Sequence, residues 1–202
     1  KVQQNIQECK DANILLCSCY VWNWEITTHL AEEVKKINPN CLIIFGGPQV
    51  PDSDPTFFKK YPYIDIIVHG EGEFVLANIL EAYSKDKDFS KILGVETKDF
   101  KNDRQPRIME LENLPSPYLT NVIWEITEKT NKINYLASWE SNRGCPYPCT
   151  YCDWGSLTAQ RMSTWDEDRL NKEIEWFGEN KIVYVDSCDA NFGIFQEKDL
   201  KL

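Results

Sequence analysis

The chain has 202 residues, which is enough for one domain and part of another at roughly 150 residues per domain. Hydrophobic residues make up 42% of it and charged residues 27%, a balance that is typical of globular proteins and excludes wholesale disorder. The net charge of −10 disfavours non-specific binding to the phosphates of a nucleic acid. No apolar run approaches the roughly 20 residues of a membrane span, so we expect neither a nucleic acid nor a membrane as a partner.

The start of the chain and the positions of its cysteines indicate the compartment in which we expect the protein to work. The chain begins at Lys1 and shows no basic and apolar leader, so we expect a fragment of a longer, cytoplasmic protein without a secretory signal. Its eight cysteines are too few for a small disulfide scaffold. Because Cys145, Cys149 and Cys152 lie close together, they indicate metal or redox chemistry in a reducing compartment.

The first half of the chain alternates short apolar runs with amphipathic patterns. Buried parallel strands are predicted at residues 13–17, 41–45 and 64–68. Helices are predicted with apolar faces formed by Ile26, Leu30, Val34 and Ile37, by residues near 57–61, and by Val75, Ile79 and Ala82. This alternation predicts an α/β domain over residues 1–90, with a Rossmann-like parallel sheet and helices on both of its faces.

The second half of the chain is less regular. Charged and proline-containing segments over residues 91–134 are interpreted as a linker with some short strands. A strand is predicted at residues 135–141, a helix beginning near Thr164 or Asp166, and a second strand at residues 181–186. One strand–helix–strand unit is therefore expected over residues 135–202.

The segment Cys145-Pro-Tyr-Pro-Cys149-Thr-Tyr-Cys152 carries the strongest chemical signal in the sequence. Three thiolates on one loop can hold three corners of a cubic iron–sulfur cluster, because soft sulfur ligands select iron–sulfur or zinc. One iron then stays open to a non-protein ligand. A structural zinc site needs four ligands, and the candidates for a fourth, Cys188, His29 and His69, are distant in the sequence. A non-enzymatic iron–sulfur or zinc module for electron transfer or interaction is the alternative function.

This pattern, with Tyr151 in the aromatic place before the last cysteine, resembles the radical S-adenosylmethionine (radical SAM) superfamily. The resemblance implies a partial (β/α) barrel that starts at residue 135 and a [4Fe-4S] cluster held by Cys145, Cys149 and Cys152. It implies that the cluster cleaves S-adenosylmethionine into methionine and a 5′-deoxyadenosyl radical, with Tyr151 against the adenine. It also implies an external electron donor such as flavodoxin or ferredoxin, and a small-molecule or peptide substrate.

Three loops of the first half are similar to those of the cobalamin-binding domain that precedes the barrel in one branch of this superfamily. They are Ser18-Cys19-Tyr20, Gly46-Gly47-Pro48 and Gly70-Glu71-Gly72-Glu73. The resemblance implies that cobalamin lies along Ser18, Gly46, Gly47, Gly70 and Glu71, and that the whole protein is a cobalamin-dependent methyltransferase. The sequence departs from the pattern in having no D-x-H-x-x-G, so no histidine is assigned as lower cobalt ligand.

Two parts of the resembling pattern are expected to lie outside the chain. The first Rossmann strand of the family is expected upstream of Lys1. Because the residues after Tyr135 supply only one barrel unit and a second strand, the chain by itself is expected to be inactive as an enzyme.

A few further residues are open to two interpretations. Asp189 and Asn191 lie in a segment similar to one that follows the second barrel strand of cobalamin-type members, which implies contact with the methionine amino group or the substrate. A solvated turn is the alternative. Arg143 is expected either to serve the cluster or S-adenosylmethionine or to form an ordinary salt bridge. His69 is expected either to approach a cofactor or to be a hydrogen-bonded loop residue.

Overall fold

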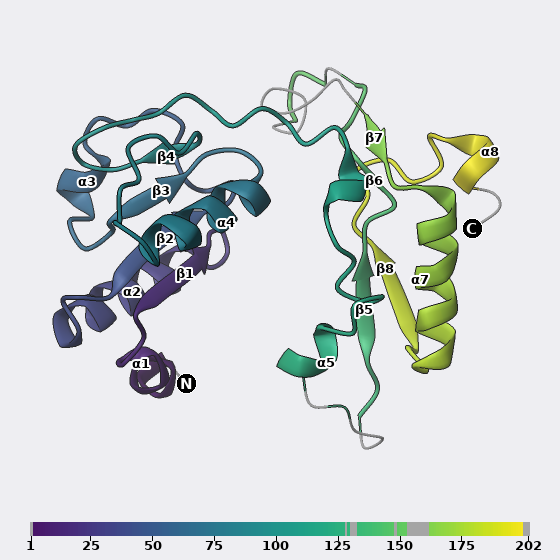
Figure 1. The fold of residues 1–202 in the computed structure, drawn as a ribbon, viewed down its shortest axis with the longest axis horizontal. Helices are drawn as coiled ribbons and strands as arrows, with labels where there is room; N and C mark the ends of the chain where they lie inside the picture. The colour runs from purple at the N-terminus through teal and green to yellow at the C-terminus, as the bar shows by residue number, and fades with distance from the viewer. Residues whose placement is uncertain (1, 128, 130–132, 148, 153–161, 200–202) are drawn as a thin grey trace. The chain divides into compact units, whose positions relative to one another are not determined.

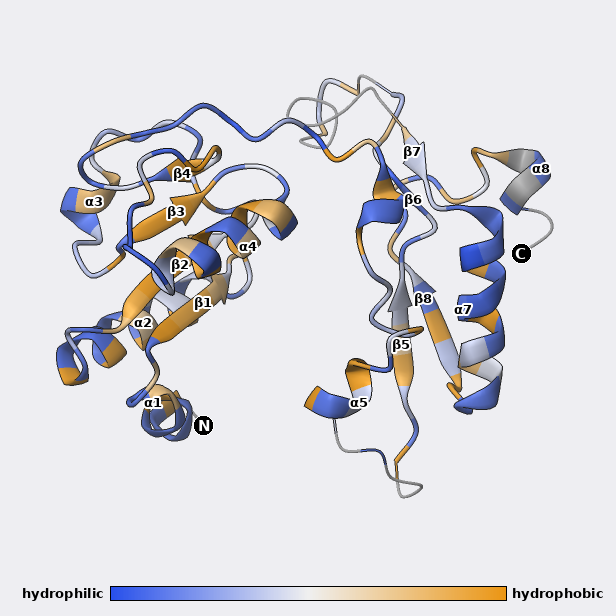
Figure 2. Cartoon of the chain, viewed as in Figure 1, coloured by the Kyte–Doolittle hydropathy of each residue, from blue (hydrophilic) through white to orange (hydrophobic). Residues whose placement is uncertain are grey.

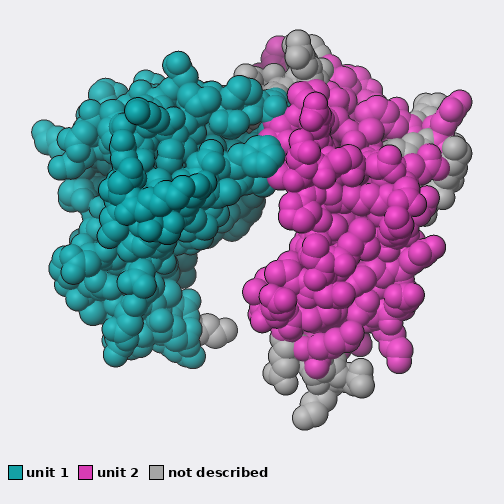
Figure 3. All heavy atoms as spheres, in the orientation of Figure 1, with its two compact units in different colours: residues 1–107 teal, residues 108–202 magenta. Residues whose placement is uncertain are grey.

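The computed structural model describes residues 2–127, 129, 133–147, 149–152 and 162–199. The chain divides into two compact units, residues 1–107 and residues 108–202, which Figure 3 shows in different colours. The division falls inside the segment 91–134, which the sequence indicates as a linker. Residues 91–107 belong to the first unit and residues 108–134 to the second.

The first unit is built on a four-stranded sheet with the strand order β1-β2-β3-β4 (Figure 1). The strands β1, β2 and β3 are parallel, and the short β4 pairs with β3 in the antiparallel direction. The elements are α1 (Val2–Cys9), β1 (Ile14–Ser18), α2 (Trp24–Ile37), β2 (Leu42–Gly46), α3 (Phe57–Lys60), β3 (Ile66–Val68), α4 (Gly72–Tyr83) and β4 (Val95–Glu96). The predicted parallel α/β sheet is confirmed. The sequence analysis missed α1, whereas β4 lies in the segment 91–134, where some short strands were expected.

Alternate residues along the inner strands β2 and β3 pack against helices on opposite sides of the sheet. Ile43, Phe45 and Ile67 join a core with residues of α2 and α3, including Val34 and Phe57. The residues between them, Ile44, Ile66 and Val68, join a second core with Val75 and Ile79 of α4. Figure 2 shows the hydrophobic colour concentrated on these strands. Helices therefore cover both faces, as a parallel sheet requires.

The buried face of α2 differs from the predicted one. Ile26 and Ile37 are 57% and 49% exposed, whereas Thr27, Ala31 and Val34 are buried. The prediction of the buried face was therefore wrong for the two isoleucines. Val34 of the predicted face is buried, and the small side chains of Thr27 and Ala31 are buried with it, so hydrophobicity alone does not decide which face is buried.

The edge strand β1 also departs from the prediction of a strand buried on both faces. Leu15 and Cys17 are buried, but Leu16 is 49% exposed. The reason is position, since the described sheet has β1 at its end with β2 as its neighbour. The core on the α2 side takes in Leu15 and Cys17, whereas the core on the α4 side reaches β1 at the partly buried Ile14 and leaves Leu16 exposed.

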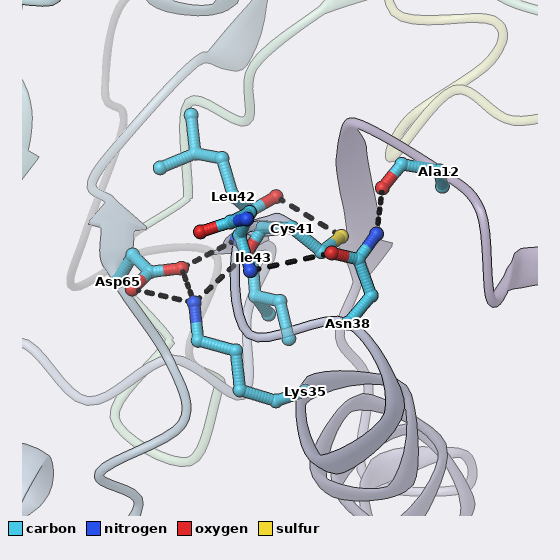
Figure 4. A network of polar contacts seen from close by, with 8 residues as sticks. Ala12, Lys35, Asn38, Cys41, Leu42, Ile43 and Asp65 are labelled. Atoms are coloured by element: carbon cyan, nitrogen blue, oxygen red, sulfur yellow. Dashed lines mark hydrogen bonds and ion pairs between the residues drawn. The ribbon is translucent and has the colours of Figure 1, made fainter.

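A polar contact network ties the end of α2 to the starts of two strands (Figure 4). The Lys35 ammonium donates to the Asp65 carboxylate at 2.7 Å and to the Cys41 carbonyl at 2.8 Å. The same carboxylate accepts from the backbone N–H of Ile43 at 2.7 Å. One partly buried ion pair therefore joins α2, β2 and the residue that precedes β3.

The second unit contains a parallel strand pair, β5 (Leu136–Trp139) and β8 (Tyr184–Ser187), joined through α7 (Glu167–Glu179). Leu136 lies opposite Tyr184 and Trp139 opposite Ser187. The predicted strand–helix–strand unit is confirmed, with shorter strands than expected. The other elements are η1 (Leu111–Asn113), α5 (Ile123–Ile126), β6 (Asn142–Arg143), β7 (Ser163–Thr164) and α8 (Gln196–Asp199).

The helix α7 begins where the sequence indicates and packs its apolar side against the sheet. The Asp166 side chain caps it by accepting from the Asp168 N–H at 2.8 Å. Leu170 and Phe177 are buried. The Trp139 indole N–H donates at 2.7 Å to the carboxylate of the buried Glu173, so the one acidic residue on this face has a partner on β5.

None of the helices within the described ranges has the length and apolar character that crossing a membrane would require.

Two buried thiols make the first unit sensitive to alkaline pH. Burial raises the pKa of Cys17 and of Cys19 from 9.0 to about 12, and burial raises the pKa of Tyr63 from 10.0 to about 12. A group whose folded pKa is raised stabilises the fold fully below its unfolded pKa, and this stabilisation is lost as the pH rises toward the folded value. The free energy of unfolding should therefore fall between about pH 9 and pH 12.

Chemical denaturation followed by far-UV circular dichroism at pH 8, 10 and 11 measures this fall. A Cys17→Ala/Cys19→Ala variant is the matched control, because it keeps Tyr63 and should lose stability less steeply with pH. A wild-type midpoint that stays constant from pH 8 to pH 11 would show that these groups ionise alike in the folded and unfolded chains.

Candidate functional site

The three clustered cysteines lie on the loop that follows β6. Gly144, at a φ of +110°, turns the chain directly after β6, in a conformation that favours glycine. Cys145, Cys149 and Cys152 are half-buried free thiols. The Cys152 N–H donates to the Cys149 carbonyl at 3.1 Å, so the last two cysteines share one tight turn.

The donor set of this loop fits an iron–sulfur cluster by its chemistry. It offers three thiols, which are the ligands that such clusters prefer. Across the described part of the chain, no group of three or more His, Cys, Asp or Glu residues is already gathered to hold a metal ion. The loop of the described structure therefore carries the three thiols without a preformed cage.

The remaining cysteines have different surroundings. Cys17, Cys19 and Cys41 are buried in the first unit, and burial raises the pKa of each thiol. A buried thiol with a raised pKa is a poor metal ligand, because the ligand is the thiolate. Cys188 is exposed just beyond β8, with its Sγ 3.9 Å from the Asp186 carbonyl.

Tyr151 lies on the cysteine loop with a 90% exposed side chain. A hydrogen bond with the Cys149 thiol raises the pKa of its phenol. Its ring is free to receive a flat ligand from solvent, which is compatible with the predicted contact to an adenine.

Asp189 is bound to the segment that leads into the cysteine loop. Its carboxylate accepts from the backbone N–H groups of Ser141 and Asn142 at 2.7 and 3.1 Å. It also accepts from the Ser141 hydroxyl at 2.5 Å and from the Asn142 amide at 3.0 Å. Ser141 and Asn142 are fully buried, so Asp189 is an anchored side chain, not the solvated turn that was the alternative.

Asn191 contrasts with Asp189. Its Nδ2 is buried and has no hydrogen-bond partner among the described residues. The Asn142 Oδ1 and the Ser163 hydroxyl share this property. Buried polar atoms normally find partners, so these three atoms are candidates for contact with a bound molecule.

Arg143 is paired within its own segment. Its guanidinium donates to the Glu140 carboxylate, with an Nη2 to Oε2 distance of 2.9 Å. Of the two interpretations given for Arg143, this contact is the ordinary salt bridge.

In the first unit, the loops after β1 and β2 are joined through Cys19. The Cys19 N–H donates to the Gly46 carbonyl at 2.7 Å, and the Cys19 carbonyl accepts from the Gln49 N–H at 3.1 Å. Ser18 lies opposite Gly46 in the parallel register, and its side chain is exposed. The Asn23 amide donates to the Ser18 carbonyl at 2.8 Å and holds the turn after β1.

The glycines of these loops differ in what surrounds them. A Cβ on Gly47, at a φ of +105°, would lie 2.7 Å from the Cys19 carbonyl oxygen. A Cβ on Gly46 would make an ordinary contact with Val68 at 3.7 Å. Gly70, at a φ of +86°, and Gly72 have no atom within 4 Å of such a Cβ. Open space therefore lies beside the loop after β3, whereas the backbone of Cys19 occupies the space where a Cβ of Gly47 would lie.

Glu71 and His69 flank Gly70. The Glu71 carboxylate forms a partly buried ion pair with Arg107 at 3.5 Å. His69 is buried, and its Nε2 lies 2.7 Å from the Glu96 carboxylate. His69 therefore has the contact expected of a hydrogen-bonded loop residue, the second of its two interpretations.

No family model matches the chain. Two curated relatives match all of it. One is the 2-(S-pantetheinyl)-carbapenam-3-carboxylate methyltransferase of Streptantibioticus cattleyicolor, 39% identical, and the other is the cobalamin-dependent radical SAM methyltransferase TokK of Streptomyces tokunonensis, 38% identical. The chain belongs to the cobalamin-binding radical SAM superfamily. It spans about 30% of the length of both relatives.

A solved structure shows the same fold. The cobalamin-dependent S-adenosylmethionine radical enzyme OxsB superposes with a TM-score of 0.70 at 20% identity, over 95% of this chain and 28% of that protein. The predicted α/β class, with a Rossmann-like parallel sheet followed by the first part of a radical SAM barrel, is confirmed by this match.

Some residues that support the two candidate sites were missed from the sequence. Ser141, Asn142 and Arg107 were not singled out, although the first two hold Asp189 and the third holds Glu71. The available signal was two polar residues between a strand and the cysteine loop. Their partner lies 47 or 48 positions away, so only the fold shows the contact.

Gly47→Ala should destabilise the first unit. The added Cβ would overlap the Cys19 carbonyl and force a positive φ on alanine, at a cost of about 1–3 kcal/mol. Thermal unfolding of the protein without added cofactor measures the cost. Gly46→Ala is the matched control, since its Cβ has room and it should unfold near the wild-type temperature. Equal unfolding temperatures for both variants would contradict the close approach of Gly47 to Cys19.

Proposed function

We propose that the protein is a cobalamin-dependent radical SAM methyltransferase, and that this chain supplies most of its cobalamin-binding sheet and the first unit of its barrel. The observation that carries this proposal is the similarity of the whole chain to two methyltransferases, combined with the three-cysteine loop that follows β6 in the second unit. The 202-residue chain by itself holds one barrel unit and is expected to be inactive.

Within this proposal, Cys145, Cys149 and Cys152 hold a [4Fe-4S] cluster. When bound, the cluster would present one open iron to S-adenosylmethionine and supply the electron that cleaves its sulfonium bond. Tyr151 places an exposed ring beside these ligands, where it can stack on the adenine. The buried Nδ2 of Asn191 can donate a hydrogen bond to a carboxylate, such as that of the methionine part of S-adenosylmethionine.

Cobalamin is assigned to the carboxyl edge of the first sheet. Ligands of open parallel sheets bind outside the carboxyl ends of the strands, and Ser18, Gly46 and the loop 70–73 lie at those ends. Gly70 and Gly72 leave space there. The Glu71–Arg107 ion pair fixes the loop between them, so its backbone N–H groups stay at the edge.

Other properties of the whole protein follow from the proposal. An external donor such as flavodoxin or ferredoxin supplies the electron, as the resemblance to the radical SAM superfamily implies. The substrate is a small molecule or a peptide that binds to the rest of the barrel. The protein works in the cytoplasm, where its thiols stay reduced.

The first test is cluster assembly. After reconstitution without oxygen, the protein should hold about four irons and four sulfides, and Cys149→Ala should lose most of them. Cys145→Ala and Cys152→Ala should behave in the same way. Cys9→Ala, in the first unit, is the matched control and should keep the full iron content.

Adding S-adenosylmethionine to the reduced protein should change its electron paramagnetic resonance spectrum, because the open iron gains a ligand. A fully ligated electron-transfer centre or a zinc knuckle would give no change. Loss of the metal in Cys188→Ala to the same extent as in Cys149→Ala would reveal a four-cysteine site and overturn the radical SAM proposal.

The second test uses Gly72→Val. The side chain would enter the open space beside the loop after β3 and should weaken cobalamin binding about tenfold, the equivalent of an overpacking cost of about 1.4 kcal/mol. Cobalamin absorbance that stays with the full-length protein after gel filtration measures the loss. Gly178→Val is the matched control, because Gly178 also faces open space but lies on α7. Equal retention by both variants would remove the loop after β3 from the cobalamin site.

A further inference from the structure

We propose that Asp189 is a positioning residue that sets the direction in which the chain enters the cysteine loop. The proposal replaces the contact with cofactor or substrate that the sequence indicates for this residue. It rests on the proposed function, because it takes the cysteine loop as the holder of the cluster.

The parallel register places Asp189 beside the start of the loop. Trp139 lies opposite Ser187 at the ends of β5 and β8, and the Cys188 N–H extends the pairing to the Trp139 carbonyl at 2.7 Å. Asp189 is two positions beyond Ser187, and Ser141 is two positions beyond Trp139. The two chains leave the sheet at the same edge, so a short side chain on one can reach the backbone of the other.

The Asp189 carboxylate is saturated by this contact. One oxygen accepts both backbone N–H groups of Ser141 and Asn142, and the other accepts the Ser141 hydroxyl and the Asn142 amide. A carboxylate has about four lone-pair sites, so these four bonds leave no acceptor for an amino group of a ligand. Both partners are fully buried, which keeps water from competing for the bonds.

The contact controls the loop because it holds two consecutive peptide groups. Ser141 is held on its other side as well, since its carbonyl accepts from the Thr164 hydroxyl at 3.1 Å. Asn142 begins β6, and Cys145 follows three residues later, after the turn at Gly144. Because the peptide planes at Ser141 and Asn142 are fixed, the chain runs toward Cys145 from a fixed position.

Two substitutions separate positioning from ligand contact. Asp189→Ala removes all four bonds and should weaken cluster binding about ten- to hundredfold, the usual effect of losing a group that orients a metal ligand. Asp189→Asn keeps an oxygen for the two backbone N–H groups. Its amide N–H faces the Ser141 hydroxyl, which can accept, and Asn142, whose side-chain amide can turn over. This variant should therefore keep its cluster and its spectral response to S-adenosylmethionine.

The experiment measures iron content and the electron paramagnetic resonance change on adding S-adenosylmethionine, for the full-length protein reconstituted without oxygen. Glu175→Ala is the matched control, an exposed acidic residue on α7 of the same unit. Far-UV circular dichroism checks that each variant is folded. If Asp189→Ala is unfolded, Ser141→Ala, which removes one bond of four, takes its place and should lower the iron content less severely.

The outcomes are distinct. A cluster in Asp189→Asn with no response to S-adenosylmethionine would make the charge of Asp189 a ligand contact and overturn the proposal. Wild-type iron content in Asp189→Ala, or in Ser141→Ala where it stands in, would also overturn it. A wild-type protein without a cluster that responds to S-adenosylmethionine would instead overturn the proposed function.

Discussion

Parallel strand pairing is the constraint on which both candidate sites depend. In a parallel pair, the chain leaves neighbouring strands at the same edge, so residues that follow different strands meet there. Ser18 lies opposite Gly46 at the end of β1 and β2, and Trp139 lies opposite Ser187 at the end of β5 and β8. The cysteine loop, Asp189 and the glycine loops all begin within a few residues of these ends. The same topological rule therefore places a candidate site in each of the two units.

Close backbone contacts at these edges explain why particular residue types stand there. Gly47 was expected to give room to a ligand, but its Cβ direction is filled by the Cys19 carbonyl, so glycine is needed to let the loops after β1 and β2 meet. Gly70 and Gly72 do face open space. The loops at this edge therefore contain one glycine that lets two loops meet, Gly47, and two glycines that leave open space, Gly70 and Gly72. Substitutions at Gly47 and at the other two glycines should have different effects on stability and on binding.

The cysteines divide by environment in a way that agrees with the proposed chemistry. Cys17 and Cys19 lie in the core under the first sheet, where burial keeps them protonated to about pH 12. Cys145, Cys149 and Cys152 are half-buried on a loop that a glycine turn and the Asp189 contact lead out of the sheet. Desolvation makes the first set poor metal ligands, whereas the second set lies on a loop that a metal can reach.

The sequence by itself determined the alternation of strands and helices, the parallel sheet and the three-cysteine loop, because these depend on local periodicity and on spacing within eight residues. The sequence did not predict the features that depend on contacts between residues far apart in the chain. The buried face of α2 contains Thr27 and Ala31 while Ile26 and Ile37 are exposed, and Leu16 is exposed because β1 lies at the end of the described sheet. Only the tertiary structure joined Asp189 to Ser141 and Asn142. That contact depends on the pairing of two strands separated by a whole helix, and it joins residues 47 or 48 positions apart, which no local pattern of residues pairs.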